Sequence, residues 1–460
     1  MTDKEKALRY VDEHFDEMVA ELARACACAS FAGNPAGLDA MRTALQNDLK
    51  SSGLTPTLHP VGDGNALISA GLSGDSPHTL LFYNHYDVVE PGKTEHWTNK
   101  APFKADVRGG KMYARGVSDN KGGLYFRLHA VRAMMNANGH LPVSVKFLVE
   151  GDEETASPSM TRFAQTNAEK FKELTQADVC LWENGRVDAA GRPWLRCGVR
   201  GAVAFDLRVT TAKSDVHGRM GATVPSASWR LIWALAALKE AVTEKIAIDG
   251  FYDDVFPASE ADLQVLHDFP YDEAHTKKSL GLKGFVRGAT GEELKRQIYL
   301  EPSLSVCGLE AGEVHNGVRG IVPHTAYARL GFYLVANQDP ADIEAKLRAH
   351  LHRQGFDDIK VTRYGGASRP VRTRPDHPFC ARAVKAAKNV YAQPMVVELT
   401  QLGAGPAAVF RDAWPDLPIF GIGPANTSGN HHAPDENLGL EDYKNSIKYL
   451  IELCYSYVRD

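Results

Sequence analysis

The sequence lacks any apolar run long enough to cross a membrane, and its amino-terminus (MTDKEKALRYVDEHF) is charged where a secretory signal peptide would be apolar. It also lacks an excess of basic residues, because 52 Lys and Arg stand against 57 Asp and Glu, a net charge of -5. That balance gives no electrostatic basis for binding nucleic acid or an anionic membrane. Internal repeats and low-complexity tracts are missing too. We therefore expect a protein that binds neither membranes nor nucleic acids.

Cysteine is scarce and unpatterned. The 460 residues contain seven, an odd number, and most of them lie among apolar residues. Cys26 and Cys28 are separated by a single residue, so they lack the C-x-x-C spacing of a zinc or redox pair. This usage is typical of a protein kept reduced, and it predicts a cytoplasmic location.

The chain is longer than one hydrophobic core usually supports, so we expect at least two domains. Strand-like runs alternate with helical patterns over residues 1–199 and again over 369–460, which predicts an α/β domain with a mostly parallel sheet flanked by helices. The first helical pattern covers residues 3–25 and is expected to form one amphipathic helix. Residues 200–368 have a few strands, some expected to be antiparallel, and two main helices. We predict that they form a smaller α+β domain inserted into the first.

Acidic residues and histidines stand at or near the ends of apolar runs, or in a glycine-flanked loop. In an open α/β sheet, sites form beyond the carboxyl ends of the strands. Taken singly, such residues have simpler roles, as hydrogen-bonded core histidines or as helix caps. Two adjacent carboxylates, however, repel each other unless something positive lies between them. The set comprises His85, Asp87, Asp119, Glu153, Glu154, Glu183, His431 and His432.

Together these side chains predict a two-metal hydrolase. Histidine and carboxylate are ligands that zinc, manganese and cobalt accept. No cysteine belongs to the set, which argues against a structural zinc site. A bridging carboxylate can hold two metal ions about 3.5–4 Å apart, where they clamp an attacking hydroxide and a carbonyl oxygen. A carboxylate that binds no metal can then act as the general base.

The segments around these residues resemble the M20 metallopeptidase family, which includes carnosine-type dipeptidases, aminoacylases, glutamate carboxypeptidases, and acetylornithine- and succinyl-diaminopimelate-type deacylases. They follow the family's order across nearly the whole chain. The matching segments are NHYD (84–87), ARGVSDNKGG (114–123), EGDEE (150–154), LWEN (181–184) and HAPDEN (432–437).

The resemblance implies a role for each matched residue and a pair of divalent metal ions, zinc in the first place, with manganese or cobalt as alternatives. It also implies a cis peptide bond after the bridging residue. Glu153 would be the general base, and Asp87 would orient His85. The implied metal ligands are Asp119 as the bridge, His85 and Glu183 on one ion, and Glu154 and His432 on the other.

The resemblance also implies that the inserted domain is a lid that mediates dimerisation, so a homodimer is expected. In the dipeptidases of the family, the lid supplies a histidine to the partner's active site. That histidine corresponds to His217, which would stabilise the oxyanion of the reaction across a dimer. The simpler alternative is an exposed loop histidine.

The departures from the family pattern gather where substrate binds. Tyr333 stands where the dipeptidases have an arginine that holds the substrate's carboxylate, and tyrosine cannot form a bidentate ion pair. The glycine-rich segment around Gly403 lacks the usual G-G-S. Arg319, in the segment with Asn316, or Arg219 could supply the missing charge. Alternatively, the substrate has no carboxylate there, and both arginines are solvated surface residues.

The leading hypothesis is therefore hydrolysis of an amide bond in a small peptide or an N-acyl amino acid, in which a metal-bridged water loses a proton to Glu153. The alternative is hydrolysis of a non-peptide C–N bond in a small molecule by a deacylase or aminohydrolase. A non-catalytic binding protein of the same fold is disfavoured, because Glu153 and every matched ligand are present.

Overall fold

The structure is a computed structural model that describes residues 1–183, 185–313, 315, 317 and 319–458. The chain divides into two compact units. Unit 1 comprises Met1–Gly198, Arg372–Leu399 and Pro406–Asp460, and unit 2 comprises Val199–Val371 and Thr400–Gly405. Among the helices of the described residues, none has the length and apolar character that a membrane span needs.

Unit 1 is built on an eight-stranded sheet with the order β1-β2-β6-β3-β7-β19-β9-β17. The central pairs β6–β3, β3–β7 and β7–β19 are parallel, and the pairs at the β1 edge are antiparallel. The sheet confirms the predicted α/β class. Its strands are β1 (Thr57–Val61), β2 (Gly64–Leu72), β3 (Ser76–His85), β6 (Val143–Glu150), β7 (Val179–Trp182), β9 (Trp194–Arg196), β17 (Val396–Glu398) and β19 (Ile419–Gly421).

The second half of strand β3 is buried on both faces, which explains the apolar run from Leu80 to Tyr83. Leu80 and Phe82 belong to the core beneath α4 and α14, whereas Tyr83 points to the opposite face, as alternate residues of a strand do. There Tyr83 stacks on Trp182 with ring centroids 4.1 Å apart and meets Phe410 of α13 edge-on at 5.2 Å. Both sides of the central sheet are therefore covered by helices.

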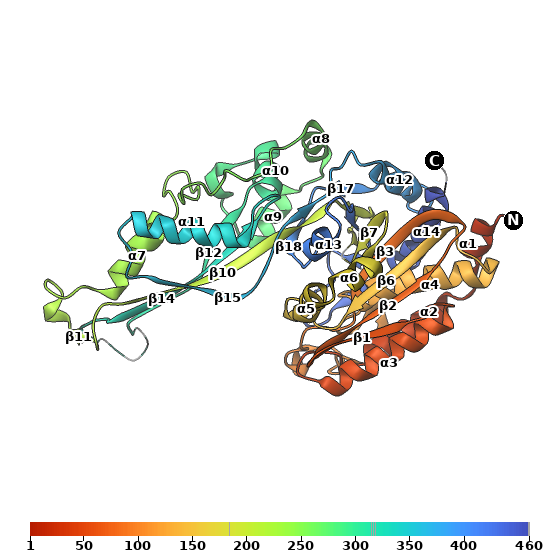
Figure 1. Cartoon of the computed structure of the whole chain (residues 1–460), viewed down its shortest axis with the longest axis horizontal. Helices are drawn as coiled ribbons and strands as arrows, with labels where there is room; N and C mark the ends of the chain where they lie inside the picture. Colours follow the sequence, from red (N-terminus) through yellow and green to blue (C-terminus); the bar gives the residue numbers. More distant parts are fainter. Residues whose placement is uncertain (184, 314, 316, 318, 459–460) are drawn as a thin grey trace. The chain divides into compact units, whose positions relative to one another are not determined.

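The helices of unit 1 form two groups, which Figure 1 shows around the sheet. The larger group packs around α4 and α14, and the smaller one joins β2 and β6 to α13. The single helix expected over residues 3–25 is two helices, because the first one ends at His14. The bounds are α1 (Asp3–Glu13), α2 (Phe15–Ala27), α3 (Pro35–Ser51), α4 (Lys121–Asn138), α5 (Pro158–Thr166), α6 (Ala168–Thr175), α12 (Pro378–Ala387), α13 (Ala408–Ala413) and α14 (Leu440–Tyr457).

Two small sheets bring together segments that are distant in the sequence. Strand β21 (Asn437–Gly439) pairs with β5 (Lys111–Tyr113), which in turn pairs with β4 (Asp106–Arg108). This pairing places the segment that follows His432 beside the segment that precedes Asp119. Strand β20 (Ala425–Asn426) pairs with β8 (Arg186–Val187), in parallel, and so joins two further segments that are distant in the sequence.

Unit 2 contains a six-stranded sheet with β12-β14-β10-β15 as its main path. Buried residues alternate along β10 and β14, because one face of the sheet packs against α7 and α11. The strands are β10 (Gly198–Thr210), β12 (Ser303–Ala311), β14 (Thr325–Leu334), β15 (Lys360–Ser368), β16 (Val371–Arg372) and β18 (Gln401–Ala404), with β11 (Val216–His217) and β13 (Ile321–Val322) as a separate pair. The helices are α7 (Ala227–Ala237), α8 (Glu260–Asp268), α9 (Glu273–Leu280), α10 (Gly291–Leu300) and α11 (Pro340–Arg353).

The segment Thr400–Gly405 belongs to unit 2, although the sequence pattern placed it within the returning part of the first domain. The physical reason is that β18 pairs with β10. We propose that the two units are the catalytic domain and the inserted lid domain expected from the sequence.

Candidate metal centre

The site forms where parallel strands of unit 1 end. Because β6, β3 and β7 are parallel neighbours, their carboxyl ends meet at one edge of the sheet. His85 is the last residue of β3, and Glu183 follows the last residue of β7. Nε2 of His85 lies 2.9 Å from Oε2 of Glu183. The turn that carries Glu153 and Glu154 follows β6 after two residues.

Asp119 joins two groups of side chains. Its Oδ1 lies 3.2 Å from Nε2 of His85, and its Oδ2 lies 3.2 Å from Nε2 of His432. Nε2 of His432 is also 3.2 Å from Oε2 of Glu154. The peptide bond from Asp119 to Asn120 is cis, as the resemblance implied. The carboxylate of Asp119 therefore lies between two pairs of side chains. One pair is His85 with Glu183, and the other is His432 with Glu154.

The charges of these side chains fit a pair of cations. Hydrogen bonds to Asp119 and Glu154 raise the pKa of His432 to about 10. Burial lowers the pKa of His85, but the carboxylates of Glu183, Asp119 and Asp87 outweigh burial and hold that pKa well above its ordinary value. Both shifts show that the carboxylates create a strongly negative environment, which favours a cation at this place.

The distances between these side chains also fit a metal site. His85, Asp119 and Glu154 each present a ligand atom, and these atoms all lie within 4.8 Å of one another. Oε1 of Glu154 is buried, and no donor among the described residues reaches it. A buried carboxylate oxygen without a partner is costly unless a cation or proton satisfies it. Two imidazoles and three carboxylates converging in this way fit two divalent ions.

Asp87 contacts both His85 and the turn that carries Glu153 and Glu154. Its carboxylate oxygen Oδ1 lies 3.3 Å from Nδ1 of His85, and its two oxygens accept the N–H groups of Glu153 at 3.2 Å and Glu154 at 3.0 Å. Nδ1 of His85 is also 3.0 Å from the carbonyl oxygen of Asp87. A proton held on Nδ1 leaves Nε2 free to bind a metal.

Glu153 lies beside the ligand cluster. Its Oε2 is 3.9 Å from Nε2 of His85, which is farther than the Glu183 and Asp119 oxygens. Burial raises the pKa of Glu153 well above its ordinary value, and the charges of Glu183 and Asp119 add to this effect. A carboxyl group with a raised pKa that stands next to the cluster can both accept and return a proton.

Glu436 is a residue of the site to which sequence reasoning gave no role. It is fully buried and accepts N–H groups from Gly116 at 2.8 Å, Ser118 at 2.9 Å and Asp119 at 2.9 Å. It also accepts a hydrogen bond from Nη1 of Arg115 at 2.7 Å. Glu436 belongs to the HAPDEN segment, which was the available signal, but the sequence does not reveal that it holds the Asp119 loop. The Nε2 atom of His431 lies 2.9 Å from Oγ of Ser118, the residue before Asp119.

The expected substrate-binding residues belong to unit 2, and Asn316 lies outside the described residues. Nδ1 of His217 accepts the N–H of Arg219 at 3.2 Å. Tyr333 is exposed on β14. Arg319 lines a cavity of about 470 Å³ with Arg208, Asp215 and His324 among its other walls. The roles of His217, Arg219, Arg319, Tyr333 and Gly403 stay predictions.

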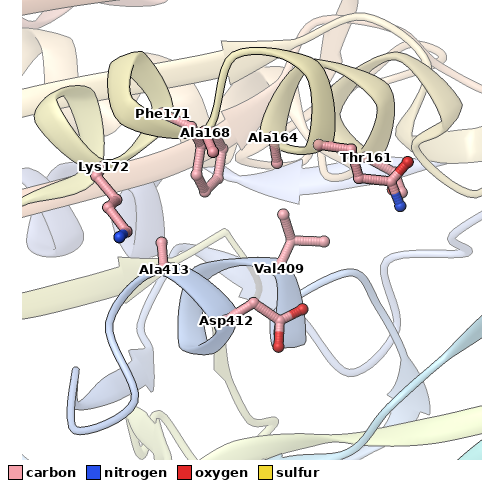
Figure 2. Close-up of a pocket in the computed structure, with 9 residues that line it drawn as sticks. Thr161, Ala164, Ala168, Phe171, Lys172, Val409, Asp412 and Ala413 are labelled. Carbon is pink, nitrogen blue, oxygen red and sulfur yellow. The ribbon is translucent and has the colours of Figure 1, made fainter.

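Unit 1 also has a cavity of about 230 Å³ between α5, α6 and α13. Figure 2 shows Phe171 and Val409 at its centre, with Lys172 and Asp412 nearer its rim. Its lining residues include one carboxylate and no histidine. This cavity therefore lacks the ligands for a metal ion.

The α/β sheet and the ligands at its strand ends define a metal-dependent hydrolase. Residues 81–456 match the model of peptidase family M20/M25/M40, and the chain belongs to that family. It is 27% identical over 380 residues to the Beta-Ala-His dipeptidase of Rattus norvegicus (78% of this chain, 76% of the relative). It is 28% identical over 401 residues to the Cysteinylglycine-S-conjugate dipeptidase of Corynebacterium striatum (85% and 84%).

Solved structures agree with this assignment. The M20 family metallo-carboxypeptidase Sso-CP2 from Sulfolobus solfataricus superposes with a TM-score of 0.87 and 30% identity, covering 96% of this chain and 99% of that one. Human carnosine dipeptidase 1 has a TM-score of 0.78 at 22% identity, covering 100% and 99%, and shares the fold.

Replacing Glu436 by alanine tests whether this carboxylate holds the Asp119 loop. Glu436→Ala should lower the free energy of unfolding by about 3–5 kcal/mol, because it leaves the buried guanidinium of Arg115 unpaired. Glu441→Ala, on the exposed side of α14, should cost less than about 0.5 kcal/mol. Denaturant unfolding with a chelator present measures both values. Equal, small costs would show that Glu436 does not anchor the loop.

Proposed function

We propose that this protein is a dimetal hydrolase that cleaves the amide bond of a small peptide or an N-acyl amino acid. The observation that carries the proposal is the position of Asp119, whose two oxygens face His85 and His432, with Glu153 beside the cluster. Relatives named as Beta-Ala-His and Cysteinylglycine-S-conjugate dipeptidases support a dipeptide substrate. Zinc is the metal we propose first, and manganese or cobalt would accept the same ligands.

The chain's own residues have defined tasks in this reaction. When bound, two divalent ions lower the pKa of a water molecule and polarise the carbonyl group under attack. Glu153 takes the proton of the attacking water and returns it to the leaving nitrogen. Asp87 keeps His85 and the Glu153–Glu154 turn in place. Burial of the side chains removes competing water and strengthens these electrostatic effects.

Replacing Glu153 by alanine separates proton transfer from metal binding. Glu153→Ala should keep both metal ions, because the five proposed ligands remain, and should lower kcat by about 10²–10⁴-fold or more. Metal analysis and steady-state kinetics on a dipeptide measure the two quantities. Glu169→Ala, at an exposed position on α6, is the control and should leave both unchanged. Normal turnover in a metal-replete Glu153→Ala protein would remove the assigned role.

The proposal for substrate recognition is that Arg319 holds the substrate's carboxylate in place of the arginine that Tyr333 replaces. Arg319 lines the cavity of about 470 Å³ in unit 2. Its guanidinium group can therefore reach a ligand that enters this cavity. The alternative is a substrate without a carboxylate at this position. Such a substrate would favour a deacylase, or an aminohydrolase that acts on a non-peptide C–N bond.

Comparing a dipeptide with its C-terminal amide tests the carboxylate contact. Arg319→Ala should raise KM for the free dipeptide at least about tenfold, since a hydrogen bond to a charged group contributes about 1.5–3 kcal/mol, and should leave the amide unaffected. Arg353→Ala, at an exposed position on α11 outside this cavity, is the control and should leave KM for both substrates unchanged. An equal loss on both substrates rejects the carboxylate contact. Turnover confined to N-acyl amino acids favours the deacylase alternative.

We also propose that the protein is a homodimer of the cytoplasm, with His217 acting on the partner's substrate. On unit 2, Trp229 and Trp233 stack on each other on α7 and are 56% and 53% exposed. The edge strand β12 exposes Val306 and Leu309 as well. Such an apolar surface supports contact with a second copy. The cysteines are seven in number, which is odd, and most of them are buried, as is typical of a protein kept reduced.

Charge placed on α7 tests the dimer. Trp229→Asp together with Trp233→Asp should convert a particle of two chains to one chain of 50.3 kDa, measured by light scattering after size exclusion. Because His217 would then be absent from the partner's site, kcat should fall in the monomer. Val242→Asp, at another exposed apolar position of unit 2, is the control. A dimer that survives the double substitution would place the interface elsewhere.

A further inference from the structure

Arg127 of α4 is a fully buried cation that the mechanism does not use. Its Nη1 donates to the carbonyl oxygen of Tyr83 at 2.8 Å and to Oδ1 of Asn84. Its Nη2 donates to the carbonyl oxygens of Trp182 at 2.6 Å and Ile422 at 3.2 Å. Within the described part of the chain, it forms no ion pair with a carboxylate. Its hydrogen-bond acceptors are therefore all neutral oxygen atoms, and its guanidinium also lies 5.2 Å from the ring centroid of Phe126 and 5.8 Å from that of Phe82.

These oxygens belong to the ends of three neighbouring strands. Tyr83 and Asn84 directly precede His85 in β3, and Trp182 directly precedes Glu183 at the end of β7. Ile422 follows β19, the parallel neighbour of β7. A single rigid guanidinium thus connects the three strands one or two residues before two of the proposed ligands. Arginine suits this task because its donors are fixed in one plane.

The connection extends to the loop of the bridging residue. Nδ2 of Asn84 donates to Oδ1 of Asn120, the residue after Asp119. Nδ2 of Asn120 in turn donates to the carbonyl oxygen of Glu183 at 3.3 Å. The backbones that carry His85 and Glu183 are therefore linked both directly through Arg127 and through this pair of amides.

Among the described residues, Arg127 makes no hydrogen bond to the segments that carry Glu154 and His432. Glu154 is held by its own N–H group, which donates to Asp87. His432 lies in the loop before β21. Neither belongs to the strand ends that Arg127 binds. The contacts of Arg127 are thus confined to the side of the site formed by His85 and Glu183.

Burying a guanidinium without a counter-ion costs free energy, because the charge loses its hydration. Hydrogen bonds to carbonyl oxygens offset only part of that cost. An apolar side chain of similar length would fill the same space in α4 without it. The arrangement is understandable if the hydrogen bonds fix a geometry that an apolar residue would leave loose.

We propose that Arg127 is a positioning residue for one half of the dinuclear centre: by binding the carbonyl groups of Tyr83 and Trp182, it fixes the separation of His85 and Glu183 for one divalent cation. This inference rests on the proposed dimetal site. It predicts that loss of Arg127 weakens one of the two cations selectively, whereas a merely structural residue would affect stability alone.

Titration of the metal-free, full-length protein with Co²⁺ tests the inference, because the visible absorption of bound cobalt reports the ligand geometry of each ion. In Arg127→Met, the affinity for one ion should fall about 10–100-fold, as is typical when a partner of a metal ligand is lost, and the other should stay within about threefold. In the visible spectrum of the cobalt-loaded Arg127→Met protein, only the bands of the more weakly bound ion should change. His85→Ala and His432→Ala, titrated in parallel, identify which ion that is, and it should be the one lost in His85→Ala.

Arg132→Met is the matched control. Arg132 lies on the same helix and is partly buried, but it binds Glu21 and Ser52 far from the strand ends. This substitution should lower the melting temperature and leave both cobalt affinities unchanged. Arg127→Lys keeps the charge with fewer donors, so it should weaken the same ion by a smaller factor, and it decides the matter if Arg127→Met does not fold.

Equal weakening of both ions, or a lower melting temperature with both affinities and spectra unchanged, would overturn the inference. A different outcome would overturn the proposed function instead: wild-type protein that binds fewer than two cobalt ions. In that case the single ion's response to Arg127→Met and Arg127→Lys still decides whether Arg127 positions His85.

Discussion

The mutual repulsion of carboxylates at the ends of parallel strands is the constraint on which the arrangement of unit 1 depends. Asp119, Glu154 and Glu183 converge around the imidazoles of His85 and His432. Such a group is stable only where positive charge is supplied. The same carboxylates raise the pKa values of His85 and His432, which is the electrostatic effect of an excess of negative charge. Because histidine and carboxylate ligands must be deprotonated to bind a metal, the affinity of such a site depends on pH.

The surrounding structure holds these ligands from several directions. The buried Glu436–Arg115 pair fixes the loop before α4 from one side, and Asp87 fixes both the end of β3 and the turn after β6. Neither of these carboxylates is a proposed ligand. Each accepts backbone N–H groups and thereby sets the course of the chain at a ligand. The precision of the site therefore depends on buried hydrogen bonds at least as much as on the ligands themselves.

The sequence predicted those features that follow from local patterns. Apolar runs indicated the strands of a mostly parallel sheet, so His85 and Glu183 could be placed at strand ends, where the structure brings their side chains to 2.9 Å. The resemblance supplied the order of the ligands and the cis bond after Asp119. Features that depend on partners distant in the chain were not predictable. Glu436 lies more than 300 residues from the loop it holds, and Thr400–Gly405 belongs to unit 2 only through the pairing of β18 with β10. The break at His14 was missed as well, because the apolar spacing continues across it.

The most direct test of this account is the metal stoichiometry and affinity of the wild-type protein and of Asp119→Ala, measured by titration of the metal-free chain with zinc against a competing chelator. If one carboxylate serves both ions, the wild-type protein binds two ions and the single substitution weakens both of them together. Retention of one ion at its wild-type affinity in Asp119→Ala would contradict the shared carboxylate and, with it, the dimetal site.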